Sequence, residues 1–269
     1  MAAQLSITRI VNSCTLIEIG GLRVLTDPWF VERWHTHRGE PLGMTTADLP
    51  DLDLIVGSNP FVNHWDRRGL AQIASKGATV VTPNGRMARI AKRAGFNNTV
   101  TLADGRSTTV KEVRVEAFSG GGLGPRTNVY VLSTPNVRLM FGGEACDVDA
   151  VRRWSAVNGP VQVAMLPVNG LSAFGRRLVM SAAEAVEAAA AAGADTLVAI
   201  HDAHYEDWIW RFIRRRSTAR DCLPVRDRIA PAMRVVDLPT GRTGSHIDLG
   251  AHQIVGRIPG GGEVTEVGA

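Results

Sequence analysis

The chain has 269 residues, of which 45% are hydrophobic and 21% are charged, a balance typical of a globular protein large enough for one α/β domain. Its longest apolar runs are too short to cross a membrane, and its first residues do not resemble a signal peptide. The formal charge of +4, carried mostly by arginine, gives little support to an anionic small-molecule substrate and less to nucleic acid.

The cysteine content indicates the compartment. Cys14, Cys146 and Cys222 are odd in number and widely spaced, which argues against a disulfide framework. We therefore expect a reduced, cytoplasmic protein. Because the basic excess is mild and no apolar run could span a membrane, we also expect a small-molecule substrate and no nucleic-acid or membrane partner. The sequence does not indicate the oligomeric state.

The first part of the chain predicts a sheet. Alternating or continuous apolar residues predict strands over 5–11, 14–19 and 22–26, with a Gly20-Gly21 turn between the last two. The run 52–56 predicts a further short, buried strand, and a helical pattern follows it from near Asp66.

Polar side chains gather between that strand and that helix: Asn59, Asn63, His64 and Asp66. The end of a strand fixes the backbone and the loop presents its side chains, an arrangement typical of functional sites. The alternative interpretation is a capped turn, in which Asp66 is the helix N-cap and Pro60 shapes the loop.

The rest of the chain alternates between predicted helices and strands. Helices are expected over 67–75, 85–94 and 180–192, and strands over 77–82, 99–102, 107–110, 113–117, 128–133, 137–141, 161–167, 196–200 and 233–238. This succession suits an α/β sandwich. The aromatic and basic stretch 207–216 predicts a packed helix with a solvated basic end rather than a surface for nucleic acid or membrane.

Several motifs of this chain, in the same order, resemble the metallo-β-lactamase superfamily, in the branch of small hydrolases that includes the ascorbate-phosphate lactonases. The motifs lie within 7–201 and comprise the opening hairpin, Thr26-Asp27-Pro28, the loop 58–66, Gly142-Gly143-Glu144, 166–170 and the strand that ends at His201. The resemblance implies the four-layer αβ/βα sandwich of that superfamily, with the site between its two sheets. We expect one domain over 1–258 and a flexible, Gly-rich tail over 259–269.

The metal loop of that superfamily is only partly kept. It reads Ser-His-x-His-x-Asp-His-x-Asp, and Ser58, His64 and Asp66 match it. Asparagine or phenylalanine stands at its other three metal-binding positions: Asn59, Phe61 and Asn63. In the family a later strand ends in Ala-x-His-Ser, whose histidine ligates the first metal, and Phe118 or Ser119 stands at that position, just before the Gly-rich stretch 120–124.

The replacements remove all ligands of the family's first metal and keep most ligands of its second metal. By resemblance, the second metal would be held by His64, His201 and Glu144, with Asn63 as a weaker, neutral ligand. Two imidazoles and one carboxylate can hold Zn, Fe or Mn, so the sequence implies either one such ion or a metal-free pocket. Asp27 either orients a ligating histidine or caps the turn before Pro28.

The candidate site is therefore His64, Glu144, His201, Asn63, Asn59 and Asp27. In the alternative interpretations, Glu144 lies at the start of a helix near Asp147, and His201 is a histidine packed in the core. Three functions remain open: a hydrolase with one metal acting on a small ester, lactone or phosphoester; a metal-free enzyme using His/Glu acid–base chemistry; and a non-catalytic pseudoenzyme that binds a metabolite or a partner in the old pocket.

Overall fold

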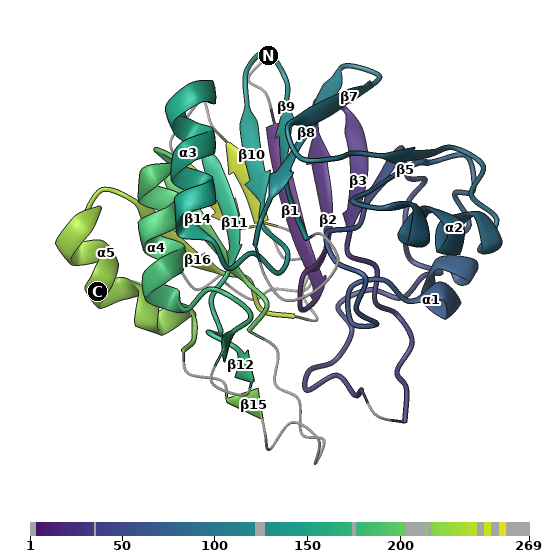
Figure 1. The fold of residues 1–269 in the computed structure, drawn as a ribbon, viewed down its shortest axis with the longest axis horizontal. Coiled ribbons are helices and arrows are strands. Elements are labelled where there is room, and N and C mark those ends of the chain that lie inside the picture. Colours follow the sequence, from purple (N-terminus) through teal and green to yellow (C-terminus); the bar gives the residue numbers. More distant parts are fainter. Residues whose placement is uncertain are drawn as a thin grey trace.

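The structure is a computed structural model that describes residues 4–34, 36–121, 127–173, 176–202, 213–214, 217–240, 245–248 and 253–256. The predicted tail 259–269 and most of the predicted helix 207–216 lie outside these residues. In the described part, strands form two large sheets that face each other, and helices cover the outer side of each sheet (Figure 1).

The first sheet has eight strands. They are, in spatial order, β18 (Gln253–Gly256), β17 (Ser245–Asp248), β1 (Gln4–Val11), β2 (Cys14–Ile19), β3 (Leu22–Thr26), β4 (Leu54–Val56), β5 (Thr79–Thr82) and β6 (Thr99–Thr101). Strands β1, β2 and β3 are antiparallel hairpin neighbours, whereas β3 to β6 run parallel to one another. This sheet contains all four strands that the sequence predicts before residue 57.

The second sheet has seven strands. They are β16 (Arg234–Asp237), β14 (Thr196–Ile200), β11 (Val163–Pro167), β10 (Arg138–Phe141), β9 (Asn128–Ser133), β8 (Val113–Ser119) and β7 (Arg106–Val110). Strands β16, β14, β11 and β10 are parallel, so their carboxyl ends lie at one edge of the sheet. That edge receives three of the predicted motifs.

Helices complete the four layers. On the first sheet lie α1 (Arg67–Gln72) and α2 (Gly85–Arg93), and on the second lie α3 (Val148–Asn158), α4 (Ala182–Ala191) and α5 (Leu223–Ile229), which follows the 3₁₀ turn Ala219–Cys222 (Figure 1). The capping box of α4, Ser181 with Glu184, is formed. The fold is the predicted αβ/βα sandwich.

Alternation along the strands explains how one chain fills three apolar layers. In β2, Ile17 and Ile19 point into the core between the sheets, while Cys14 and Leu16 point to the layer beneath α1 and α2. In β14 the same alternation sends Val198 into the central core and neighbouring residues under α4. The sheets are therefore held face to face by apolar side chains, and the polar residues of the site lie at their edge.

One predicted helix is wrong where it can be compared. Ile213–Arg214, within the predicted helix 207–216, forms strand β15 of a small third sheet with β12 (Ser172–Ala173) and β13 (Arg176–Arg177). Backbone pairing with β12 fixes the extended conformation, which overrides the helical pattern of aromatic and basic residues. Among the described residues, no helix is long and apolar enough to span a membrane.

Candidate metal centre

The candidate site lies where the carboxyl ends of the parallel strands of both sheets meet. Asp27 follows β3, and the loop with His64 follows β4. On the facing sheet, Glu144 follows β10, Asn169 follows β11 and His201 follows β14. Residues far apart in the sequence therefore converge because each is placed by the end of a strand.

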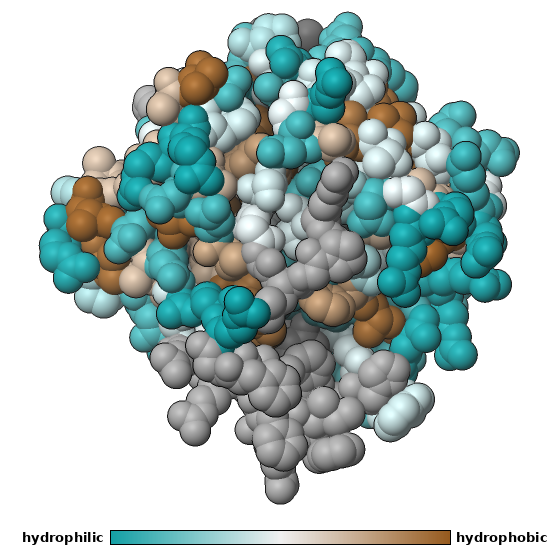
Figure 2. Space-filling view, in the orientation of Figure 1, coloured by the Kyte–Doolittle hydropathy of each residue, from teal (hydrophilic) through white to brown (hydrophobic). Residues whose placement is uncertain are grey.

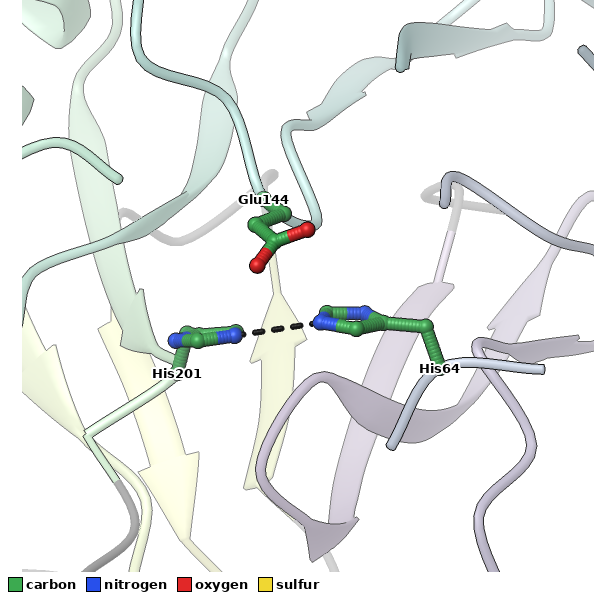
Figure 3. Close-up of side chains that lie close together, drawn as sticks. All are labelled: His64, Glu144 and His201. Carbon is green, nitrogen blue, oxygen red and sulfur yellow. Dashed lines mark hydrogen bonds between the residues drawn. The ribbon is translucent and has the colours of Figure 1, made fainter. Parts of the chain in front are cut away.

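His64, Glu144 and His201 form one buried cluster. A ligand atom of each lies within 4.8 Å of a ligand atom of the other two. The two imidazoles face each other edge to edge, with 3.1 Å between their Nε2 atoms, and Glu144 directs its carboxylate toward the gap between them (Figure 3). The loop 58–66 also forms the capped turn of the alternative interpretation, because the Asp66 carboxylate caps α1 through Gly69 N–H. One loop therefore serves both purposes.

Asp27 orients His64. Its Oδ2 accepts a hydrogen bond of 2.7 Å from His64 Nδ1 and one of 2.6 Å from the Ser58 hydroxyl, and its Oδ1 accepts from Ser58 N–H. Burial alone lowers the pKa of His64, but the Asp27 carboxylate and, to a lesser extent, Glu144 outweigh it, so the pKa is raised. A carboxylate behind a histidine that leaves Nε2 facing a site is typical of metal-binding histidines.

His201 has a different environment. Its Nδ1 lies 3.0 Å from the side-chain amide nitrogen of Asn169, whose amide oxygen accepts from Leu171 N–H at 3.0 Å. Burial, and next the charge of a protonated His64, lower the pKa of His201 well below its usual value. Both effects favour the neutral form of the His201 imidazole.

Glu144 is a buried carboxylate with an unused oxygen. Its Oε2 has no hydrogen-bond partner among the described residues. Burial raises the pKa of Glu144 to about 7, against the opposing effect of His64. Helix α3 begins four residues later and is capped by Asp147, so Glu144 does not start that helix.

The backbone around the site is tightly constrained. Asn12, Asp27 and His201 all have positive φ, of 55°, 37° and 58°, a conformation that non-glycine residues rarely adopt. Both side-chain amide atoms of Asn12 are buried without a hydrogen-bond partner among the described residues. Such conformations gather at functional sites, where surrounding structure holds them.

Gly143 allows Glu144 to reach the site. Its φ is +39°, and a Cβ there would lie 2.0 Å from Ser58 Oγ and 3.0 Å from Asp27 Oδ2. We expect Gly143→Ala to lower the free energy of unfolding by about 2–4 kcal/mol, combining left-handed strain with overpacking. Urea denaturation measures it. Gly105→Ala is the matched control, since φ is +70° and nothing lies within 4 Å. An equal loss in both variants would contradict the close packing of Gly143 on Ser58.

Asn59, Phe61 and Phe118 do not contribute ligands to the cluster. Both polar atoms of the Asn59 side chain have partners outside the cluster: its Oδ1 accepts a hydrogen bond from Phe61 N–H, and its Nδ2 donates one to Thr127 Oγ1. Phe61 is 49% exposed, and Asn63 is buried beside His64 in the sequence. Phe118 stacks on Trp154 in the layer beneath α3. No imidazole stands at the described positions that correspond to the first metal.

The structure also reveals residues that sequence reasoning missed. Asn169 was visible only as part of a motif, and its contact with His201 depends on the pairing of β11 with β14. Arg9, buried on β1, forms ion pairs with Glu40, with Asp202 next to His201, and at 3.9 Å with Asp237. This buried arginine ties the strand end that carries His201 to the opposite sheet.

The cluster fits one divalent cation. His64 donates Nδ1–H to Asp27, so the lone pair of its Nε2 points toward His201 and Glu144, and Glu144 offers a buried oxygen that has no hydrogen-bond partner among the residues that the structure describes. Two nitrogen ligands that each bond at about 2.1 Å to one ion can have the observed 3.1 Å separation. His64, Glu144 and His201 are thus the residues that would hold such an ion.

Comparison with known proteins agrees with the fold. A family model described as the beta-lactamase superfamily domain matches residues 22–201. The Mycobacterium tuberculosis protein Rv0906 is 27% identical over 219 residues, covering 74% of this chain, while the match spans 59% of that relative. Neither the family model nor this relative distinguishes the ascorbate-phosphate-lactonase branch, which stays a prediction.

Solved structures show the same architecture. A possible metal-dependent hydrolase from Veillonella parvula has a TM-score of 0.72 at 14% identity, covering 93% of this chain and all of that one. A metallo hydrolase from Ignicoccus hospitalis has a TM-score of 0.68 at 14% identity, covering 90% and 98%. At these identities the likeness concerns the fold alone.

Proposed function

The chain belongs to the beta-lactamase superfamily, and we propose that it is a hydrolase of a small ester, lactone or phosphoester that works with one metal ion. The observation that carries this proposal is the convergence of His64, Glu144 and His201 in one buried cluster. The match covers only 59% of the length of Rv0906. The activity of that whole protein is therefore no guide to the substrate of this chain.

Each residue has a defined part in this proposal. A divalent cation supplies Lewis acidity, which activates water and polarises a carbonyl or phosphoryl oxygen. His64 and His201 provide neutral nitrogen ligands, and Glu144 provides the negative charge. Asp27 and Ser58 hold His64 in its orientation. Because the ligands of the family's first metal are replaced, we propose one ion per chain. Two imidazoles and one carboxylate suit zinc, iron or manganese.

A second candidate rests on the raised pKa of Glu144. A carboxyl with a pKa of about 7 beside two imidazoles can donate or accept a proton near neutral pH. This would suit metal-free acid–base catalysis. A pseudoenzyme that binds a metabolite or partner in the same pocket is the third alternative.

Metal content and turnover separate these candidates. Protein purified without chelators should contain one zinc, iron or manganese ion per chain and hydrolyse at least one member of a panel of esters, lactones and phosphoesters. Chelation and His64→Ala should each abolish both properties. Turnover that survives chelation would support the metal-free enzyme instead, and a metal-free protein without turnover would support the pseudoenzyme. Two tightly held ions per chain would contradict the proposed single site.

Rebuilding the metal loop should strengthen metal binding. The triple variant Asn59→His, Phe61→His, Asn63→Asp restores the family's loop and adds a carboxylate next to His64 in the sequence. We expect at least about tenfold higher metal affinity by calorimetric titration, the lower end of what changes around a metal site produce. The double variant without Asn63→Asp is the control and should bind like wild type. An unchanged affinity in a folded triple variant would show that the side chain at position 63 does not reach the ion held by His64, Glu144 and His201.

A further inference from the structure

The candidate cluster is divided between the two sheets. His64 lies in the loop after β4 of the first sheet, whereas Glu144 and His201 follow β10 and β14 of the second. On the outside, the face shown in Figure 2 has hydrophobic residues scattered among hydrophilic ones, with no single broad apolar patch. Between the sheets, in contrast, a few buried polar groups make directed contacts. The geometry of the cluster depends on the contacts that tie the loop of His64 to the second sheet.

Strand β9 of the second sheet makes such a tie at the start of that loop. The hydroxyl of Tyr130 donates a hydrogen bond of 3.0 Å to the carbonyl oxygen of Gly57. Asn128 N–H donates a hydrogen bond of 3.1 Å to the carbonyl oxygen of Ser58. Gly57 and Ser58 are the first two residues after β4. The backbone of the loop is therefore held from the opposite sheet as soon as it leaves its own.

The place of Tyr130 in β9 gives this contact its reach. Tyr130 pairs directly with Phe141, the last residue of β10, and Glu144 follows three residues later. The ring of Tyr130 belongs to the apolar core between the sheets, and the other members of that cluster have no hydroxyl or amide group. Phenylalanine would fill the same apolar space, so the core does not explain the hydroxyl. The carbonyl of Gly57 does.

The direction of the Tyr130 bond is fixed by its neighbours. The Gly57 carbonyl can only accept, so the hydroxyl donates to it. The side-chain NH₂ of Asn128 lies 3.4 Å from the hydroxyl oxygen and also donates at 2.9 Å to the carbonyl of Leu102, which sets the direction of that amide. Burial raises the pKa of Tyr130, so the hydroxyl keeps its proton.

The same peptide group also holds Asp27. The carbonyl of Gly57 and the N–H of Ser58 belong to one planar peptide unit, so fixing the oxygen also fixes the direction of the N–H. Ser58 N–H donates at 2.6 Å to Oδ1 of Asp27, whose Oδ2 lies 2.7 Å from His64 Nδ1. A hydrogen bond accepted by the carbonyl oxygen also polarises the peptide and strengthens the bond that its N–H donates.

We propose that Tyr130 is a positioning residue for the metal centre: its hydroxyl orients the peptide between Gly57 and Ser58, and through that peptide the Asp27 carboxylate and the His64 ring. Tyr130 acts through Asp27 and is not itself a ligand. The orientation of Asp27 can be tested without a metal ion. The consequence for metal binding rests on the proposed function.

Tyr130→Phe tests the orientation, because it removes the hydroxyl and keeps the ring that fills the core. In ¹H–¹⁵N spectra of chelated protein, we expect the amide proton of Ser58 to move to higher field, since its bond to Asp27 weakens. Ile19→Val is the control: Ile19 belongs to the same core cluster and lies at the end of β2 away from the site. It should lower stability and leave the Ser58 resonance unchanged. An unchanged Ser58 resonance in Tyr130→Phe would overturn the proposal.

Zinc titration tests the consequence for metal binding. We expect Tyr130→Phe to bind zinc about tenfold more weakly than wild type, the lower end of the range for groups that act behind a metal ligand. Ile19→Val should bind zinc like wild type, although urea denaturation shows a loss of stability. An equal loss of affinity in both variants, or an unchanged affinity in Tyr130→Phe, would mean that Tyr130 is a structural residue only. If wild type binds no zinc while the Ser58 resonance shifts as expected, the proposed function fails and the orientation of Asp27 by Tyr130 stands.

Discussion

Glu144→Gln should weaken metal binding more than 100-fold and should not destabilise the metal-free protein. Glu144 is the only anionic member of the three-residue cluster, and the amide that replaces it is a neutral ligand. Groups that merely orient a ligand change metal affinity 10–100-fold, so loss of a charged ligand should exceed that range. The metal-free protein should keep or gain stability, because a buried ionised carboxylate costs free energy and an amide of the same shape costs less.

This combination separates a functional residue from a structural one. Zinc titration gives the affinity, and urea denaturation in the presence of a chelator gives the free energy of unfolding. Glu112→Gln is the control, since Glu112 is exposed and should change neither quantity. If Glu144→Gln lowers the stability of the metal-free protein and leaves zinc affinity unchanged, Glu144 is a structural residue and the proposed centre is wrong.

The stability of the metal-free protein should depend on pH through the same residue. Burial raises the pKa of Glu144 from 4.5 to about 7 in the folded state. The unfolded chain therefore loses the proton first as the pH rises. Below pH 4.5 the carboxyl is neutral in both states, and between about pH 4.5 and 7 the folded state loses stability relative to the unfolded state. The difference between these two pKa values corresponds to a loss of about 3 kcal/mol in the free energy of unfolding.

Comparing wild type with Glu144→Gln isolates this contribution from other titrating groups. Urea denaturation of both proteins across this pH range, with a chelator present, should show a difference that grows toward higher pH and levels off above about pH 7. Zinc should oppose the loss in wild type, since a bound cation favours the ionised carboxylate. A difference that is constant across the range would mean that Glu144 keeps an ordinary pKa, and that it is not buried as the structure has it.

The sequence predicted most of the elements that position the site. Strands such as Cys14–Ile19 and Thr196–Ile200 have an apolar pattern that is local, and the structure has them with these bounds. The order of the motifs also predicted that His64, Glu144 and His201 would meet. Helix α3 and the strands Ser245–Asp248 and Gln253–Gly256 were missed, because their patterns are weak and the two strands pair with β1 and with each other.

What the sequence could not supply are contacts made across the sheets. Arg9 donates to the carbonyl of Leu238, 229 residues away, and no local pattern marks such a contact. The direction of the Asn169 amide depends on Leu171 N–H, which only the folded loop after β11 places. The helix predicted over 207–216 failed at Ile213–Arg214 for the same reason, since pairing with β12 decides that conformation.

X-ray diffraction from metal-loaded crystals, collected at the absorption edge of the bound metal, tests the proposed centre most directly. We expect one anomalous peak per chain, bonded to His64 Nε2, His201 Nε2 and a carboxylate oxygen of Glu144. A peak at other side chains, two peaks in this pocket, or a well-ordered triad with no peak at saturating metal would contradict a single-metal centre in this protein.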